Sequence, residues 1–216
     1  MRIPAWMVAA GLMIGAQTLT AGQVFFTDFE SGVPGEFSGA GAAEGTQGFS
    51  GISTFQTLFL RNSTLSPILA STLTLTSLPS HTFLNIGFLL AIIDGWDGAA
   101  PGFDDRFNVN VDGTPVFSQN YTNYDLGQPY GGVRLTTSGC SCGFGATGDN
   151  AYLLSLNVPH TASTATIDFF ASGPNYAVDD NSWAIDDVSV SAEVPEPSSL
   201  LLLASGAVAL LLRRRK

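Results

Sequence analysis

Aspartate and glutamate side chains gather in three places, and their spacing is the main sign of chemistry in this sequence. The groups are residues 27–30, residues 94–98 with Asp104 and Asp105, and residues 179–188. Calcium takes about six to eight oxygen ligands from carboxylates, carbonyls and asparagine side chains, often in flexible loops. Each group therefore indicates a calcium site, with a solvated turn as the alternative, because aspartate often only caps a turn.

Aromatic side chains in polar, turn-rich sequence are the second chemical signal. Tyr121, Tyr124 and Tyr130 lie in such a segment. A ring that is exposed there can stack on a sugar ring while its hydroxyl stays hydrated. We therefore predict these tyrosines as ligand-binding residues. For Trp96 and Trp183 we favour burial at the ends of a folded core over sugar stacking.

The chain has two cysteines, Cys140 and Cys142, which are separated by one residue. In an oxidising compartment they are expected to form a local disulfide, with unpaired thiols or intermolecular bridges as alternatives. A structural zinc site needs about four ligands. His81 and His160 have no ligand-like spacing, so a metal role for the cysteines is disfavoured.

Catalytic motifs do not stand out in this sequence. It lacks a Gly-x-Ser-x-Gly elbow, a His-Glu-x-x-His pair and a phosphate-binding loop. His81 follows Pro79-Ser80, His160 follows Pro159, and both are predicted to be surface loop residues. Paired carboxylates for glycoside hydrolysis could be drawn from 18 acidic residues, but their number alone identifies no pair. We therefore predict a protein that is not an enzyme.

The segments that must position these groups have the pattern of β-strands. Alternating apolar and polar residues, rich in β-branched and aromatic types, recur between glycine-rich turns. Residues 82–93 are almost continuously apolar and are expected at the centre of a sheet, and Asp112-Gly113 predicts a hairpin turn. The expected strands are 23–29, 52–60, 71–77, 82–93, 106–111, 115–118, 151–158, 164–171 and 183–191, and residues 32–51 are expected to form a glycine-rich loop.

This series of short strands predicts an all-β fold, an antiparallel β-sandwich of the jelly-roll type. In the usual topology of that fold the first and last strands lie side by side. Such a pairing brings Glu30, at the end of the first strand, near Asp186 and Asp187 in the last strand.

The body also resembles jelly-roll modules such as carbohydrate-binding modules and MAM-like domains. The residues that carry the resemblance are Phe29-Glu30, residues 94–98, residues 105–113 and residues 183–190. In such modules an early glutamate and an aspartate of the terminal strand often hold a structural calcium. The resemblance implies this role for Glu30 and Asp186, with Asp187 as a substitute, ahead of Asp94, Asp97, Asp104 and Asp105.

The N-terminus has the layout of a secretory signal peptide. Arg2 is its one basic residue, residues 6–16 form an apolar core, and small residues follow at positions 20–22. We expect export by the Sec machinery and removal of residues 1–22. An N-terminal membrane anchor is the alternative.

The C-terminus reads as a short membrane helix with a basic end. Residues 198–212 are mostly apolar, and the four residues after them are basic. This run is shorter than the roughly 20 residues of a comfortable span, but snorkelling side chains and local thinning of the bilayer make it sufficient. Because basic flanks stay in the cytoplasm, the body is expected on the periplasmic side. A buried core helix is the alternative.

A Pro-Glu-Pro turn, an apolar helix and a terminal arginine cluster, in this order, resemble the PEP-CTERM sorting signal of Gram-negative, exopolysaccharide-producing bacteria. The resemblance implies cleavage near the motif by an exosortase, a membrane cysteine transpeptidase-like enzyme. It also implies a transient stay in the inner membrane and a final place on the cell surface or in the extracellular matrix. The matching residues are Val194, Pro195, Glu196 and Pro197, with Arg213, Arg214 and Arg215.

The charge balance of the body limits its partners. The chain carries 18 acidic and 8 basic residues, for a net charge of −10. Within residues 23–192 the basic residues are Arg61, Arg106 and Arg134. Nucleic-acid binding needs basic clusters, so we predict no nucleic-acid partner. Divalent cations and neutral partners suit this surface.

These expectations combine into one layout: a signal peptide (1–22), a β-sandwich (23–192), a linker with the Pro-Glu-Pro motif (193–197), a transmembrane helix (198–212) and a basic cytoplasmic tail (213–216). The expected function is that of an exported, biofilm- or exopolysaccharide-associated protein whose body is a calcium-stabilised binding or structural module. A polysaccharide hydrolase and a self-associating matrix protein are the alternatives.

Overall fold

The computed structural model describes residues 20–63, 69–99, 104–124, 131–136, 140, 142–144, 148–173 and 181–194. The chain separates into two compact units, Ala21–Val194 and a unit made of Met1–Thr20 with Pro195–Lys216. The proposed signal peptide, membrane helix and basic tail lie outside the described residues, apart from residues 20–22. Within the described part, no helix has the length and apolar character to cross a bilayer.

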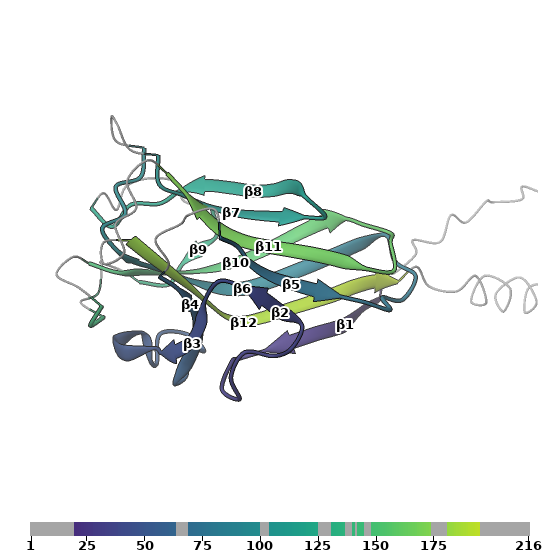
Figure 1. Cartoon of the computed structure of the whole chain (residues 1–216), viewed down its shortest axis with the longest axis horizontal. Helices are drawn as coiled ribbons and strands as arrows, with labels where there is room; N and C mark the ends of the chain where they lie inside the picture. Colours follow the sequence, from purple (N-terminus) through teal and green to yellow (C-terminus); the bar gives the residue numbers. More distant parts are fainter. Residues whose placement is uncertain are drawn as a thin grey trace, which may run out of the picture. The chain divides into compact units, whose positions relative to one another are not determined.

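Two β-sheets pack face to face in the unit Ala21–Val194, as the strand pattern predicts (Figure 1). The larger sheet has the order β3-β4-β12-β6-β10-β9 with β1 beside β12, and the smaller has the order β2-β5-β11-β7-β8. Pairs with a described register are antiparallel. The strands are β1 (Thr20–Thr27), β2 (Phe37–Gly39), β3 (Ala42–Gly45), β4 (Leu58–Asn62), β5 (Ser71–Leu75), β6 (Phe83–Asp94), β7 (Arg106–Val111), β8 (Thr114–Asn120), β9 (Val133–Arg134), β10 (Asn150–Pro159), β11 (Ala165–Ser172) and β12 (Asn181–Val194).

Strand β6 lies inside the larger sheet, between β12 and β10, as its apolar run predicts. Its residues alternate between two hydrophobic clusters. Phe88 and Leu90 face the core between the sheets, whereas Leu89 and Ala91 belong to a second cluster on the outer face. Both faces of β6 are therefore buried, which explains why its sequence is almost continuously hydrophobic.

The second cluster exists because residues 46–57, which we call the cover segment, fold over the outer face of the larger sheet. Phe49 of the 3₁₀ helix η1 (Gln47–Phe49) and Phe55 pack there against Phe59 of β4. The Thr46 hydroxyl donates to the Gln56 carbonyl oxygen at 2.7 Å and ties the ends of the segment together. The strand expected at 52–60 consequently begins only at Leu58, and the expected loop 32–51 contains β2, β3 and η1.

Two further local predictions are confirmed. Strands β7 and β8 form the expected hairpin, and Asp112 and Gly113 at its turn have φ angles of +50° and +74°. Strand β1 pairs with β12, so the first and last strands are neighbours (Figure 1). Because β1 pairs with β12, Glu30, which follows β1 closely in sequence, comes near the larger sheet that contains Asp186 and Asp187.

Candidate functional site

The outer face of the smaller sheet is lined by polar side chains. Along β7 and β11, hydrophobic residues point inward at every second position, and the residues between them, which point outward, are polar except for Phe170. The antiparallel register sets the outward residues opposite one another: Asp168 pairs with Asn110, Phe170 with Asn108, and Ser172 with Arg106. We call this surface the polar sheet face: Thr72, Asn108, Asn110, Asp168, Phe170 and Ser172.

A shallow groove of about 440 Å³ runs over the polar sheet face. Its lining combines the half-buried ring of Phe170 with the polar groups of Asn110, Asp168 and Ser172. The Asp168 carboxylate is already oriented, because the Thr72 hydroxyl donates to its Oδ1 at 2.8 Å. The groove thus offers one aromatic surface beside groups that can both donate and accept hydrogen bonds.

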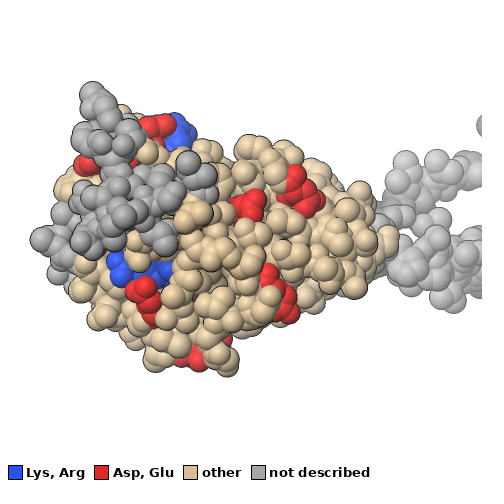
Figure 2. Space-filling model, in the orientation of Figure 1, with Lys and Arg blue, Asp and Glu red and all other residues tan. Residues whose placement is uncertain are grey.

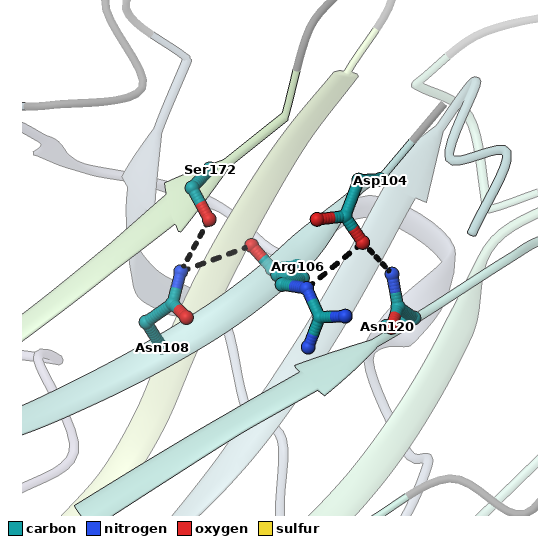
Figure 3. Close-up of polar contacts among 5 residues, drawn as sticks. All are labelled: Asp104, Arg106, Asn108, Asn120 and Ser172. Atoms are coloured by element: carbon teal, nitrogen blue, oxygen red, sulfur yellow. Dashed lines mark hydrogen bonds and ion pairs between the residues drawn. The ribbon is translucent and has the colours of Figure 1, made fainter. Parts of the chain in front are cut away.

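Hydrogen bonds also fix the polar side chains next to this groove (Figure 3). Asn108 Nδ2 donates to Ser172 Oγ at 2.9 Å. Arg106 Nε and Asn120 Nδ2 both donate to Asp104 Oδ1, at 2.8 and 2.7 Å. The hydrogen bond from Arg106, followed by that from Asn120, lowers the pKa of Asp104. These side chains are therefore held in place before any ligand arrives.

A second candidate site lies where β1 ends beside β12. Asp186 and Asp187 occupy a bulge at which the β12–β6 register shifts, and Asp187 has a φ of +47°. The Asp186 side chain is 1% exposed. Burial, together with the negative charges of Asp187, Asp28 and Glu30, raises the pKa of Asp186 to about 8. The fold therefore brings Glu30 into electrostatic range of Asp186, as the strand order predicts.

The cover segment and Leu58, the first residue of β4, supply the other contacts of this acidic site. Glu30 accepts backbone N–H bonds from Thr57 at 2.8 Å and from Leu58 at 2.7 Å, as well as the Thr57 hydroxyl. The Thr57 hydroxyl is the largest cause that lowers the pKa of Glu30. The Thr54 hydroxyl donates to Asp187. The site is thus a set of carboxylates closed on one side by the cover segment, a donor set that suits a hard cation.

The carboxylates of this site are spread more widely than a metal centre requires. In the part of the chain that the structure describes, the three ligand-type side chains within 4.8 Å of one another are Cys140, Cys142 and Asp149. Those cysteines form a disulfide, as expected, so their sulfurs are not thiolate ligands. A cation at Asp186 would have to draw Glu30 and Asp187 closer.

The residues predicted around position 100 divide into two groups. Asp105 is buried, and its Oδ2 accepts the Asp97 N–H at 2.7 Å and the Asn181 amide at 3.2 Å. Asp94 pairs with Asn181 in the β6–β12 register. Asp104 accepts hydrogen bonds from Arg106 and Asn120, and its charge raises the pKa of Asp105. Its role as a metal ligand stays a prediction.

The tyrosines predicted to bind a ligand differ in their exposure. Tyr121 is 0% exposed, lies against Tyr152 at a centroid distance of 4.9 Å, and donates its hydroxyl to the Gly131 carbonyl at 2.8 Å. Its predicted role as an exposed platform is therefore wrong, and burial raises its pKa. Tyr124 is 59% exposed and remains a candidate. Tyr130 lies outside the described residues.

Trp96 and Trp183 are buried, as we favoured.

The prediction that the two histidines are surface loop residues is wrong, because His81 and His160 are buried and their rings stack on each other. His81 Nε2 lies 2.7 Å from His160 Nδ1, whose Nε2 faces Asp112 at 3.0 Å. With His81 Nδ1 on the Pro79 carbonyl, the ends of this row are both acceptors.

Sequence reasoning did not identify the polar sheet face as a site. The signal was present, since residues 106–111 alternate so that Asn108 and Asn110 point away from the core. The same alternation in residues 165–172 brings Phe170 to that side. What the pattern lacked was the information that these two segments are neighbours.

Comparison with known proteins identifies the C-terminus. Residues 193–216 match the family model of the PEP-CTERM protein-sorting motif. The chain thus ends in a sorting signal, which implies an exported, surface-associated protein that an exosortase processes. A search of curated proteins finds no match.

Solved structures with a similar fold are remote in sequence. The K3 cleaved adhesin domain of Lys-gingipain from Porphyromonas gingivalis has 13% identity and a TM-score of 0.50, and the match covers 79% of this chain and 100% of that one. The CBM22-1 xylan-binding domain of Paenibacillus barcinonensis Xyn10C has 10% identity and a TM-score of 0.46, covering 82% and 99%. At this identity the first likeness shows the fold alone, a β-sandwich.

Proposed function

We propose that this chain is an exported, non-enzymatic binding module that holds saccharide chains on the polar sheet face. The observation that carries the proposal is the groove in which Phe170 lies among Asn110, Asp168 and Ser172. A sugar ring has an apolar face and a rim of hydroxyl groups. An aromatic ring flanked by amide, carboxylate and hydroxyl groups matches both features.

The shape and charge of this surface favour a polymer over a small molecule. The groove is open to solvent, so a ligand longer than the groove can rest on it and continue over the neighbouring surface. The face of the molecule in Figure 2 is largely uncharged, with acidic atoms in small separate groups. Such a surface suits neutral or weakly charged polysaccharide, which is the class of ligand that we propose.

The two other functions considered for this body have less support. Glycoside hydrolysis generally uses a pair of carboxylates. Among the described residues that line the groove at Phe170, Asp168 supplies the one carboxylate. Self-association through a sheet edge needs a regular free strand. The edge strand β8 carries Pro115, and its pairing with β7 shifts register between Val109 and Asn110.

We further propose that Glu30, Asp186 and Asp187 hold a structural calcium ion, with Asp28 nearby. Support comes from the buried Asp186 carboxylate, on which three neighbouring negative charges act. A divalent cation would offset that repulsion and would fasten β1, β12 and the cover segment together. The ion would stabilise the fold without touching the ligand, because it would lie on the other sheet.

The ends of the chain complete the proposal. Residues 1–22 would be removed after export through the Sec machinery, and residues 198–212 would hold the precursor briefly in the inner membrane. Cleavage by an exosortase near Pro195-Glu196-Pro197 would then release residues 23–192 to the cell surface or a biofilm matrix. The sorting-motif match over residues 193–216 supports this route.

Affinity electrophoresis in gels that contain neutral or acidic soluble polysaccharides tests the binding proposal. The purified protein should be retarded by at least one polymer. Phe170→Ala should weaken that binding about tenfold, equivalent to about 1.4 kcal/mol, whereas Tyr124→Ala, which removes an exposed ring outside the groove, should not. Retardation that depends on Tyr124 and not on Phe170, or no retardation by any polymer, would contradict the proposal.

A further inference from the structure

Four residues with oxygen-bearing side chains lie close to one another where β6 ends and β12 begins, and we call them the end cluster: Asp94, Asp97, Asp105 and Asn181. Asp94 is the last residue of β6 and pairs in register with Asn181, the first residue of β12. Asp105 directly precedes β7 and accepts hydrogen bonds from Asp97 N–H and from the Asn181 amide. Residues far apart in sequence are thus held around one point.

Two oxygens of the end cluster are buried without a hydrogen-bond partner. They are Asp105 Oδ1 and Asn181 Oδ1, on side chains that are 1% and 6% exposed. The hydrogen bond between the Asn181 amide and Asp105 Oδ2, 3.2 Å long, keeps these side chains adjacent. A buried acceptor without a partner is unfavourable, so two of them side by side call for a ligand that both can bind.

The charges around Asp105 have the sign that a cation requires. In the described part of the chain, the charges that act on Asp105 are those of Asp97 and Asp104, and both raise its pKa, after burial as the main cause. Arg106 follows in sequence, but its Nε is bound to Asp104 at 2.8 Å. The carboxylate of Asp105 is therefore buried beside like charges rather than beside a counter-ion.

We propose that Asp105 and Asn181, together with Asp97, form a second calcium site, separate from the one at Glu30 and Asp186. All of its side-chain donors are oxygen, which suits a hard divalent cation and not zinc or copper. The ion would bind the free oxygens of Asp105 and Asn181 and offset the charge of Asp97. It would join the end of β6, the start of β7 and the start of β12.

The experiment counts bound calcium on the full chain, purified in a neutral detergent and stripped with a chelator. Equilibrium dialysis against calcium should show one fewer ion per chain for Asp105→Asn than for the unaltered protein. Asp104→Asn, a neighbouring carboxylate bound to Arg106 and Asn120, is the matched control and should lose none. Asp186→Asn should lose a different ion, so that failure of either calcium site is recognised separately.

A second variant guards against a loss caused by misfolding. Asn181→Asp adds a carboxylate at the site, so calcium should raise its melting temperature more than that of the unaltered protein, and chelation should lower it more. Bound terbium, excited through the adjacent Trp96, gives a local readout that Asp105→Asn should abolish. Equal ion counts in Asp105→Asn and the unaltered protein would overturn the proposal. So would an Asn181→Asp protein that calcium does not stabilise, since a shared proton or water would then satisfy these oxygens.

Discussion

At the scale of single residues, the buried carboxylate of Asp186 is the most telling group. Its pKa is raised from 3.8 to about 8, first by burial and then by the charges of Asp187, Asp28 and Glu30. The folded state therefore binds a proton there that the unfolded chain releases at a much lower pH. Burial raises the pKa of Asp105 and Asp149 in the same direction.

This shift predicts how stability depends on pH. Because the folded-state pKa of Asp186 is raised, its contribution is fully present below pH 3.8 and is lost as the pH rises through about 8. In chelator, the melting temperature should therefore fall over this window. Asp186→Asn cannot ionise at this position, so it should flatten the decline and raise the melting temperature at the alkaline end.

Calcium should reverse this dependence, since a cation favours the ionised carboxylate. In excess calcium the melting temperature should hold or rise toward alkaline pH, and calorimetry in buffers of different ionisation enthalpy should detect proton release on binding. The control is Asp168→Asn, which removes a carboxylate of the polar sheet face. It should leave the pH dependence of the melting temperature unchanged, both in chelator and in excess calcium. A melting temperature that rises with pH in chelator would mean that Asp186 is not the buried acid described here.

At the scale of elements, local pattern predicted most strands. Alternation in residues 106–111, the apolar run of β6 and the Asp112-Gly113 turn each act within a few residues, so their structure follows from neighbours in sequence. The adjacency of β1 and β12 followed from the usual order of a jelly roll. That order was enough to place Glu30 near Asp186.

The elements that escaped prediction depend on distant contacts. Strands β2 and β3 consist mainly of glycine, alanine and serine, which carry little strand preference. They form because β5 and β4 offer them edges. Tyr121 looked like a loop residue, but the chain folds back so that its ring packs edge-on against Trp96 at 6.5 Å.

The polar sheet face could not be predicted from the sequence for a similar reason. Alternation tells which residues share a face, but not which face of a sandwich stays open. The outer face of the larger sheet is closed by Phe49 and Phe55 of the cover segment. The outer face of the smaller sheet carries the polar groove at Phe170 instead. Only the folded structure distinguishes the two.

The cover segment provides the prediction at this scale. A Cβ on Gly48 would lie 2.8 Å from Cys142 Cα, where the Gly48 N–H donates to the Cys142 carbonyl at 2.8 Å. Gly48→Ala should therefore push the disulfide segment away and destabilise the fold by about 1–3 kcal/mol in urea unfolding. Gly35→Ala, where nothing lies within 4 Å, should leave stability unchanged or slightly higher. Equal effects of the two substitutions would show that Gly48 is not packed against Cys142.

At the scale of the whole molecule, the C-terminal sorting signal and the β-sandwich have different proposed roles. The terminal sorting signal directs the protein to its place, and the β-sandwich carries the proposed activity. Within the sandwich, the acidic site of Asp186 belongs to the larger sheet, whereas the groove at Phe170 belongs to the smaller one. Calcium would therefore govern stability, and the polar sheet face would govern ligand choice.

The measurement that tests the central claim most directly is an NMR titration of the calcium-loaded protein with oligosaccharides of the polymer that retards it best. The side-chain amide signals of Asn108, Asn110 and Asn120 should shift, because these groups lie in or beside the groove. The amide of Asn85, a residue of β6 in the larger sheet that donates to Glu193 Oε1, should not shift. Shifts confined to the backbone around Tyr124, or no shifts at saturating ligand, would contradict saccharide binding on the polar sheet face.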